Sequence, residues 1–191
     1  MDRGEKFEFH GINHVALVAR DMAETTEFYE NVLDMPLVMA IPIPGGGQHF
    51  FFDCGNGDLV AFFWFKDAPP VAPGIASQHL DVRKDGAATA HGSMNHLAFS
   101  IAPENFDAYL ERLHQRGIET SVINHNDPPH EASIAFTETT WIRSMYFYDP
   151  NGIKLEFAAT LRAFNEDDIA LEPFDAEGRP VKLDRAARTL A

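Results

Sequence analysis

A short segment near the start of the chain returns in its second half with the same pattern of residue types. Ile12-Asn13-His14-Val15-Ala16-Leu17-Val18 matches Met94-Asn95-His96-Leu97-Ala98-Phe99-Ser100, an offset of 82 residues (96 minus 14). In both copies Asn-His precedes an apolar residue, an alanine and another apolar residue. This alternation predicts a strand in each copy, with the histidine on the same face as the alanine. A duplicated strand restricts the chain to folds built from two copies of one module.

Each predicted strand is followed by a predicted helix. The first helix is expected over residues 21–33, where apolar residues recur at helical spacing and Asp21 stands at the N-cap. The second is expected over residues 103–116, with Pro103 at its start and Gly117 just past its end. The two halves therefore continue in the same way after the repeated strand.

Three more strands are expected after each helix. They cover residues 37–43, 49–54 and 59–65 in the first half and residues 119–124, 141–148 and 153–158 in the second. Each half is thus a predicted βαβββ module. The expected fold class is α+β, with the two modules pairing into one curved mixed sheet around a metal site. The length of 191 residues suits one domain over 1–160 (module one 10–66, linker 67–91, module two 92–160) and a C-terminal tail over 161–191.

The same repeat indicates where a metal would bind. Aligning the final hairpins of the two halves places Ala61 opposite Glu156. Duplicated modules commonly associate about a pseudo-twofold axis, so His14 and His96 can face each other, and Glu156 joins them from one side only. We therefore expect one divalent metal on His14, His96 and Glu156. Two imidazoles and one carboxylate leave open positions, as in sites that bind Fe(II), a chelating substrate and dioxygen.

The other candidate residues have a structural alternative beside the functional one. A single histidine in a strand is more often a hydrogen-bonded core or surface residue than a metal ligand. Burying the Glu156 carboxylate in an apolar run without a partner would cost free energy, however, and this favours the metal site. Tyr146 is either a hydrogen-bond donor to substrate or a core tyrosine, and His49 is either an acid-base group or a surface imidazole. Residues 124–131 form a polar insertion. Four residues in or near it either line the mouth of a pocket or belong to a solvated loop: Trp141, Arg143, His125 and His130. Phe62 belongs to an aromatic run that suits either the core or the wall of an aromatic pocket.

Charge and composition exclude several classes of function. Acidic residues outnumber basic ones 29 to 15, and the net charge of −14 disfavours nucleic acid and anionic lipid surfaces as partners. The chain has no apolar run that could span a membrane and no apolar leader at its start, so a cytoplasmic location is expected. Cys54 is the only cysteine, so metal ligands must be nitrogen and oxygen.

With these motifs the chain resembles the vicinal oxygen chelate superfamily, which includes glyoxalases, extradiol dioxygenases, fosfomycin-type thiol transferases and drug-binding resistance proteins. The resemblance covers about residues 10–160 and rests on the two Asn-His strands and on Tyr146 to Glu156. In the extradiol signature a tyrosine precedes the ligand glutamate by ten residues, as Tyr146 precedes Glu156 here (156 minus 146). The resemblance is greatest to the small one-domain extradiol dioxygenases. It implies Fe(II), O2, a catechol-like aromatic substrate such as a biphenyl-type diol, and a homo-oligomer.

Departures from that pattern keep other activities open. Glyoxalase-type and epimerase-type sites add a fourth ligand where this chain has Ala61. The extradiol signature has a histidine where this chain has Thr137-Glu138-Thr139, so the acid-base group is unassigned and His49 is the substitute candidate. The alternatives are a lyase or thiol transferase of the same superfamily, with Mn(II), Zn(II) or Ni(II), and a non-catalytic aromatic-binding resistance protein. Phosphonate substrates would favour a cationic pocket, whereas few basic residues stand near the motifs.

Overall fold

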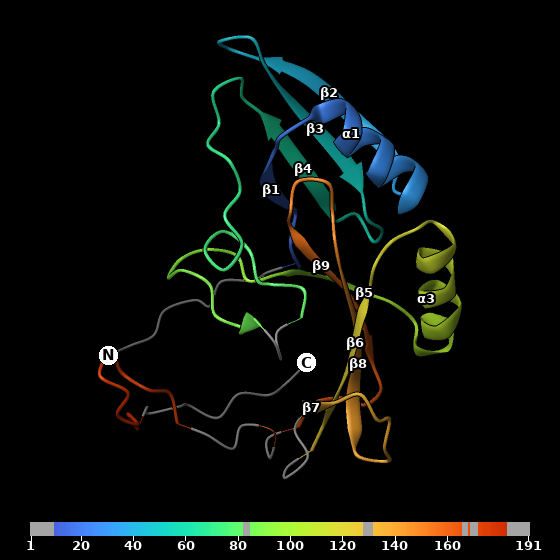
Figure 1. Ribbon diagram of the computed structural model, residues 1–191, viewed down its shortest axis with the longest axis vertical. Helices are drawn as coiled ribbons and strands as arrows, with labels where there is room; N and C mark the ends of the chain where they lie inside the picture. Colours follow the sequence, from blue (N-terminus) through green and yellow to red (C-terminus); the bar gives the residue numbers. More distant parts are fainter. Residues whose placement is uncertain (1–9, 82–84, 128–131, 166–167, 169–171, 183–191) are drawn as a thin grey trace.

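The structure is a computed structural model that describes residues 10–81, 85–127, 132–165, 168 and 172–182. Figure 1 shows two modules, one above the other, each with a sheet and a helix at its side. The first sheet has the order β1-β4-β3-β2 and the second the order β5-β9-β8-β6-β7. The strands are β1 (His14–Ala19), β2 (Leu37–Ile43), β3 (Gly47–Asp53), β4 (Leu59–Trp64), β5 (Leu97–Ser100), β6 (Ser121–Asn126), β7 (Ala132–Ser133), β8 (Thr140–Tyr148) and β9 (Lys154–Thr160).

The predicted helices form at the predicted places. In the first module α1 (Met22–Glu27) continues into a π-helical segment, η1 (Phe28–Val32), and the Asp21 side chain caps it by accepting hydrogen bonds from the Ala23 and Glu24 N–H groups at 2.9 and 3.0 Å. In the second, a 3-10 turn, η2 (Pro103–Asn105), leads into α3 (Phe106–Gln115). The α+β class and the βαβββ modules are confirmed.

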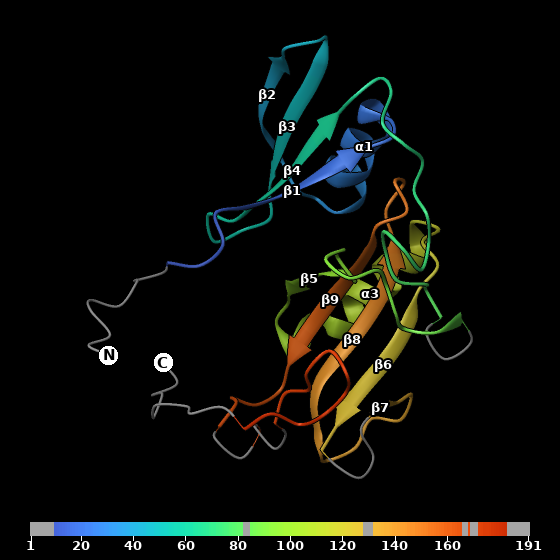
Figure 2. The ribbon, with the colours of Figure 1, turned by 90° about the vertical axis from the view of Figure 1, so that its left-hand side faces the viewer.

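Each sheet has one face against its helix and one face without a helix. In the first module Phe62 and Phe52 are fully buried and pack with Tyr29 of η1, at ring-centroid distances of 5.0 and 5.3 Å. In the second, Phe147 packs with Phe157 at 5.0 Å on the α3 side. Because side chains alternate along a strand, the neighbouring positions lie on the helix-free faces. Figure 2 shows both sheets in front of their helices, so the two helix-free faces are on the same side of the molecule.

The two modules form separate sheets rather than the one curved sheet that was expected. They join instead through the β8–β9 turn, which reaches from the second module to α1 (Figure 1). There the Asn151 side chain accepts a hydrogen bond from the Arg20 N–H at 2.8 Å and donates to the Thr25 hydroxyl at 3.1 Å. The Tyr29 hydroxyl donates to Asp149 at 3.3 Å. These hydrogen bonds, of which the Asn151–Thr25 and Tyr29–Asp149 bonds are buried, fix the modules end to end. A repeat in the sequence does not specify this arrangement.

Within the described residues, no helix is long and apolar enough to cross a membrane. His130, residues 1–9 and parts of the expected tail (166–167, 169–171 and 183–191) fall outside the described residues.

Candidate metal centre

His96 and Glu156 meet on the helix-free face of the second sheet. Glu156 of β9 lies between Ala98 of β5 and Tyr146 of β8 in the strand register, and His96 immediately precedes β5. The His96 Nε2 atom is 2.9 Å from Glu156 Oε2. Glu156 is only 4% exposed, whereas the His96 side chain is 32% exposed. The pair therefore has a buried carboxylate and an imidazole that borders solvent.

Asn95 sets the direction of the His96 ring. The Asn95 amide donates to the Ala87 carbonyl at 2.9 Å, which turns its oxygen toward His96 Nδ1 at 2.8 Å. A carbonyl oxygen only accepts, so Nδ1 carries a proton and Nε2 presents either its lone pair or a second proton to Glu156. If Nε2 presents its lone pair, then Nε2 and Glu156 Oε2 are two acceptors 2.9 Å apart, and they are stable only with a proton or another cation between them. An oriented imidazole opposite a carboxylate therefore fits a divalent metal.

The electrostatic surroundings keep Glu156 ionised. Burial by itself would raise the pKa of Glu156, but the hydrogen bond to His96, the nearby Ser144 hydroxyl and the attraction of His96 and His125 lower that pKa below its ordinary value. A buried carboxylate that is negative at neutral pH is ready to bind a cation without first losing a proton.

His14 lies on the other sheet. It repeats the local geometry of His96, because its Nδ1 is 2.8 Å from Asn13 Oδ1, and its ring packs edge-on against Phe51 at 5.8 Å. The side chain is exposed, and Ala61 occupies the next strand with no donor atom. Among the described residues of one chain, no group of three His, Cys, Asp or Glu side chains is assembled. The structure thus brings together two of the three predicted ligands.

Tyr146 and His125 extend the site on the same face. The Tyr146 ring lies edge-on to His96 at 5.5 Å, and its hydroxyl is 3.4 Å from His125 Nε2. Burial, with the negative charge of Glu156, raises the pKa of Tyr146 to about 12, so the hydroxyl keeps its proton at neutral pH. His125 lies in β6, beyond the predicted end of that strand at residue 124. The alternation of Ser121, Ile123 and His125 was the signal that could have placed it on this face.

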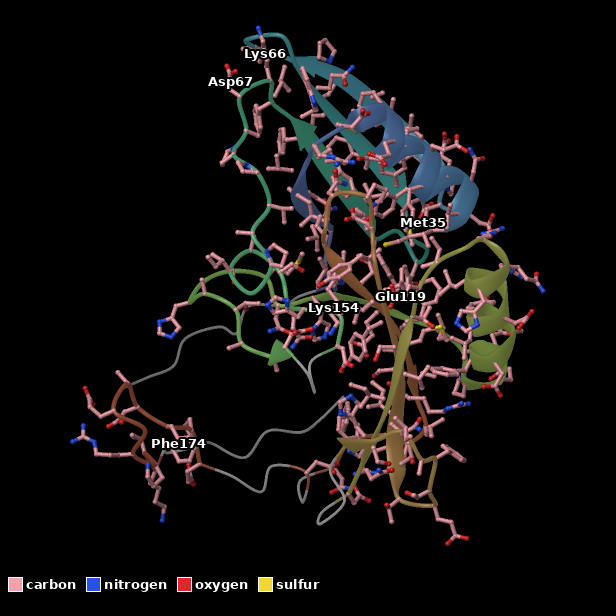
Figure 3. The ribbon with its side chains drawn as sticks, in the orientation of Figure 1. Met35, Lys66, Asp67, Glu119, Lys154 and Phe174 are labelled. Atoms are coloured by element: carbon pink, nitrogen blue, oxygen red, sulfur yellow. The ribbon has the colours of Figure 1, made fainter. Side chains whose placement is uncertain are left out.

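Lys154 adds a positive charge that the motifs did not reveal. Its ammonium group is fully buried, lies 4.3 Å above the Tyr146 ring and donates to the Gln78 side chain at 2.6 Å and to the His79 carbonyl at 3.0 Å. Figure 3 shows Lys154 beside the linker that carries these acceptors. Burial lowers the pKa of Lys154 to about 8. The expectation of few basic residues near the motifs therefore overlooked one directly beside Glu156.

The other candidate residues lie away from the pair. His49 belongs to β3 of the first sheet, where it is stacked on Phe63 at 3.6 Å and its Nδ1 is 3.1 Å from the Phe62 carbonyl. Phe62 itself is in the core beneath η1. Neither residue is on the face that carries His96 and Glu156.

Arg143 and Trp141 are two positions apart in β8 but have different contacts, because the pairing of β6 with β8 is irregular between Ile142 and Thr140, where Trp141 lies. Arg143 points to the helix side, where it stacks on Phe106 at 3.9 Å and pairs with Asp107 at 3.0 Å. A position one residue from Ser144 in a strand must face the opposite side of the sheet. Trp141 packs against His125 at 5.6 Å and so borders the site.

The sequence pattern and the fold agree with a known family. A model described as the Glyoxalase/Bleomycin resistance protein/Dioxygenase superfamily matches residues 11–157. The chain belongs to this superfamily. The match spans both modules, the linker and all the residues of the centre.

Three curated proteins whose names describe different activities resemble the chain. Fosfomycin resistance protein FosX of Listeria innocua is 24% identical over 73% of this chain and 81% of its own length. Metallothiol transferase FosB of Bacillus licheniformis is 28% identical over 76% of the chain and 73% of its length. The putative ring-cleaving dioxygenase MhqA of Bacillus subtilis is 25% identical over 89% of the chain and 48% of its length.

Solved structures share the fold. A glyoxalase family protein from Enterococcus faecalis has a TM-score of 0.55 at 20% identity and covers 78% of this chain and 98% of its own. FosX from Listeria monocytogenes, solved with Mn(II) and a sulfate ion, has a TM-score of 0.50 at 22% identity and covers 81% and 96%. At these identities the likeness concerns the fold alone.

Proposed function

We propose that the chain is a metal-dependent enzyme that acts on a small substrate with two neighbouring oxygen donors. The observation that carries this proposal is the His96–Glu156 pair, with Nε2 and Oε2 2.9 Å apart on a helix-free face. A divalent cation there would supply Lewis-acid activation of the bound substrate. Mn(II) is the first candidate metal because a FosX relative was solved with it, and Fe(II) is the second.

We propose that the third ligand is His14 from a second copy of the chain. The β8–β9 turn holds the modules of one chain end to end, so His14 stays away from Glu156. The helix-free face of the first sheet is apolar and open, since Val18, Met39, Ile41 and Phe65 are 41–52% exposed. Large apolar side chains gathered on one open face are a common mark of an interface. Because both helix-free faces are on one side (Figure 2), two copies related by a twofold axis would bring each first sheet over the partner's second sheet.

The preferred reaction is transfer of a thiol or water to a small electrophile of the fosfomycin type. The similarity to FosX and FosB supports this class. Lys154 supports it as well, because a buried ammonium group beside the carboxylate favours an anionic substrate. In this reaction Tyr146 would hydrogen-bond to a substrate oxygen.

Ring cleavage of a catechol with Fe(II) and O2 is the second candidate. It is favoured by Tyr146 beside Glu156 and by aromatic side chains on the first sheet, where Phe63 stacks on His49 at 3.6 Å and on Phe65 at 5.6 Å. The similarity to MhqA is a further argument. Such a face would pack well against a flat aromatic ring.

One set of assays separates these functions. The full chain is purified under nitrogen, its metals are measured, and Mn(II) and Fe(II) binding is followed by calorimetry. The Mn(II) form is then incubated with fosfomycin, with and without thiols, and followed by phosphorus NMR, while the Fe(II) form is tested on catechols with an oxygen electrode. Glu156→Gln should abolish tight metal binding, whereas His114→Gln, an exposed control on α3, should retain it. Equal binding by wild type and Glu156→Gln would refute the metal centre.

A further inference from the structure

The linker between the two modules is held against the second sheet by buried polar contacts. The fully buried Lys154 ammonium group donates to the Gln78 side chain at 2.6 Å. It also donates to the carbonyls of His79 and Leu80 at 3.0 and 3.4 Å. An ammonium group has three protons, so each of them has an acceptor in the linker. Lys154 therefore acts on a substrate through its charge rather than by contact, and its hydrogen bonds keep the linker beside the centre (Figure 3).

Gln78 is the linker residue at which these contacts converge. It is buried, and its four polar groups all have partners. The backbone N–H donates to the Asn95 carbonyl at 3.0 Å, and the backbone carbonyl accepts from the Tyr148 hydroxyl at 2.7 Å. The side-chain oxygen accepts from Lys154, and the side-chain NH2 donates to the Ala87 carbonyl at 2.9 Å. A buried amide with all of its groups hydrogen-bonded is held in one orientation.

The Ala87 carbonyl sets the direction of two side-chain amides. It accepts from the NH2 groups of Gln78 and Asn95, each at 2.9 Å. Because a carbonyl oxygen cannot donate, both amides turn their nitrogen toward it and their oxygen away from it. The Asn95 oxygen then lies 2.8 Å from His96 Nδ1, and the Gln78 oxygen lies 2.6 Å from Lys154 Nζ. A chain of hydrogen bonds thus joins the buried ammonium group to the ring of a proposed metal ligand.

The first copy of the repeat shows what the linker adds to the second. Asn13 makes the same contact to His14, with Oδ1 2.8 Å from Nδ1. Within the described part of the chain, however, no carbonyl accepts from the Asn13 NH2 group in the way that Ala87 accepts from Asn95, and Asn13 is exposed. The linker therefore holds the asparagine of the second copy in a way that the first copy does not share.

We propose that Gln78 is a positioning residue of the metal centre, which holds the His96 ring in its ligating direction through Ala87 and Asn95. The inference rests on the proposed function, and it makes the linker part of the centre as well as a connection between the modules. Groups that orient a metal ligand commonly account for about a 10- to 100-fold difference in metal affinity. Gln78 is one step further from the ligand than Asn95, so its effect should lie at the lower end of this range.

Mn(II) calorimetry on the full chain tests the proposal with two substitutions that leave the charge unchanged. Gln78→Met keeps the length of the side chain and removes both of its hydrogen bonds, so Mn(II) affinity should fall about tenfold. Ser77→Ala is the matched control, because Ser77 is also buried and accepts from the Lys154 backbone N–H at 2.8 Å, but it is outside the chain of amides. Both variants should be less stable in urea, whereas Ser77→Ala should keep Mn(II) affinity within about twofold of wild type.

A double-mutant cycle separates positioning of His96 from general loosening of the linker. If Gln78 acts through Asn95, adding Gln78→Met to Asn95→Ala should change Mn(II) affinity by less than about twofold, because the ring is already free. An effect of Gln78 that does not pass through Asn95 would add in full to that of Asn95→Ala. Full additivity, wild-type affinity in Gln78→Met, or an equal loss in Ser77→Ala would overturn the proposal.

Proton NMR of the metal-free full chain, with labelled histidine and amide nitrogens, gives a readout that needs no metal. In the wild type the NH2 groups of Gln78 and Asn95 should both show nuclear Overhauser contacts to Ala87, which tests the chain of amides even if Gln78→Met does not fold. Gln78→Met should broaden the His96 Nδ1–H signal or move it upfield, whereas Ser77→Ala should leave it in place. Missing contacts to Ala87, or an unchanged His96 signal in Gln78→Met, would refute the positioning role. If the wild type binds no metal, the proposed function fails, while these signals still decide whether Gln78 orients the ring.

Discussion

Complementation between two inactive variants would show whether each metal centre is built from two chains. In the proposed dimer every site takes His14 from one copy and the His96–Glu156 pair from the other. A His14→Ala dimer and a Glu156→Gln dimer each have no complete site. A heterodimer of the two has one complete site, because the Glu156→Gln chain supplies His14 to the intact pair of its partner.

The expected recovery follows from counting. Tandem purification with two different tags isolates the heterodimer, which should bind Mn(II) tightly at about half of its sites, whereas a random mixture of the two chains should recover about a quarter. Calorimetry gives this stoichiometry directly. The matched control is the heterodimer of His96→Ala and Glu156→Gln. Both substitutions damage the His96–Glu156 pair, so neither chain can supply an intact pair to a site, and we expect no recovery.

Three results would refute the shared site. The first is full Mn(II) binding by His14→Ala alone, which would remove His14 from the centre. The second is no tight binding by the purified heterodimer, which would mean that the ligands come from one chain. The third is a monomeric wild type in light scattering at concentrations where it binds metal.

Three further predictions concern single groups. Asn151→Ala removes the acceptor of the part-buried Arg20 N–H and one of the two partners of the Thr25 hydroxyl, which keeps its bond to the Asp21 carbonyl. The free energy of unfolding should therefore fall by about 1–3 kcal/mol in urea titrations, and an unchanged midpoint would contradict the docking role of the turn. Asn95→Ala frees the His96 ring, and Mn(II) affinity should fall about 10- to 100-fold in calorimetry; unchanged affinity would show that Asn95 does not orient the ligand. The pKa of Lys154 is lowered to about 8 in the folded chain, so between pH 8 and 10 the unfolded chain binds more protons at this residue than the folded chain does. The contribution of Lys154 to the free energy of unfolding therefore rises with pH in this range. Urea titrations of the metal-free protein should show this rise in the difference between wild type and Lys154→Met, and a difference that is flat with pH would contradict it.

The repeat in the sequence was sufficient to predict the two modules, and it also gave the candidate metal ligands. Helix and strand periods are local properties, so residues 21–33 and 103–116 were predicted as helices and are helical. The pairing of His96 with Glu156 also followed from the repeat, because equivalent positions in a βαβββ module lie on neighbouring strands. The predicted strand ended at residue 124, two residues before the observed end of β6 at Asn126. This difference placed His125 in a loop instead of on the strand beside Tyr146.

The relation between the modules was decided only by tertiary structure. Local patterns do not encode whether two sheets join or stay apart, because that depends on contacts between residues distant in sequence, such as Asn151 with Thr25 and Arg116 with Asp34. The sequence also did not show which basic side chains face the centre. Lys154 and Arg143 both lie near the motifs, but only Lys154 faces the centre, whereas Arg143 packs on Phe106 on the helix side. The sequence alone therefore determined which residues are candidates for the chemistry. The fold determined that one chain brings together two of the three predicted ligands, His96 and Glu156, and leaves His14 on the open face of the other sheet.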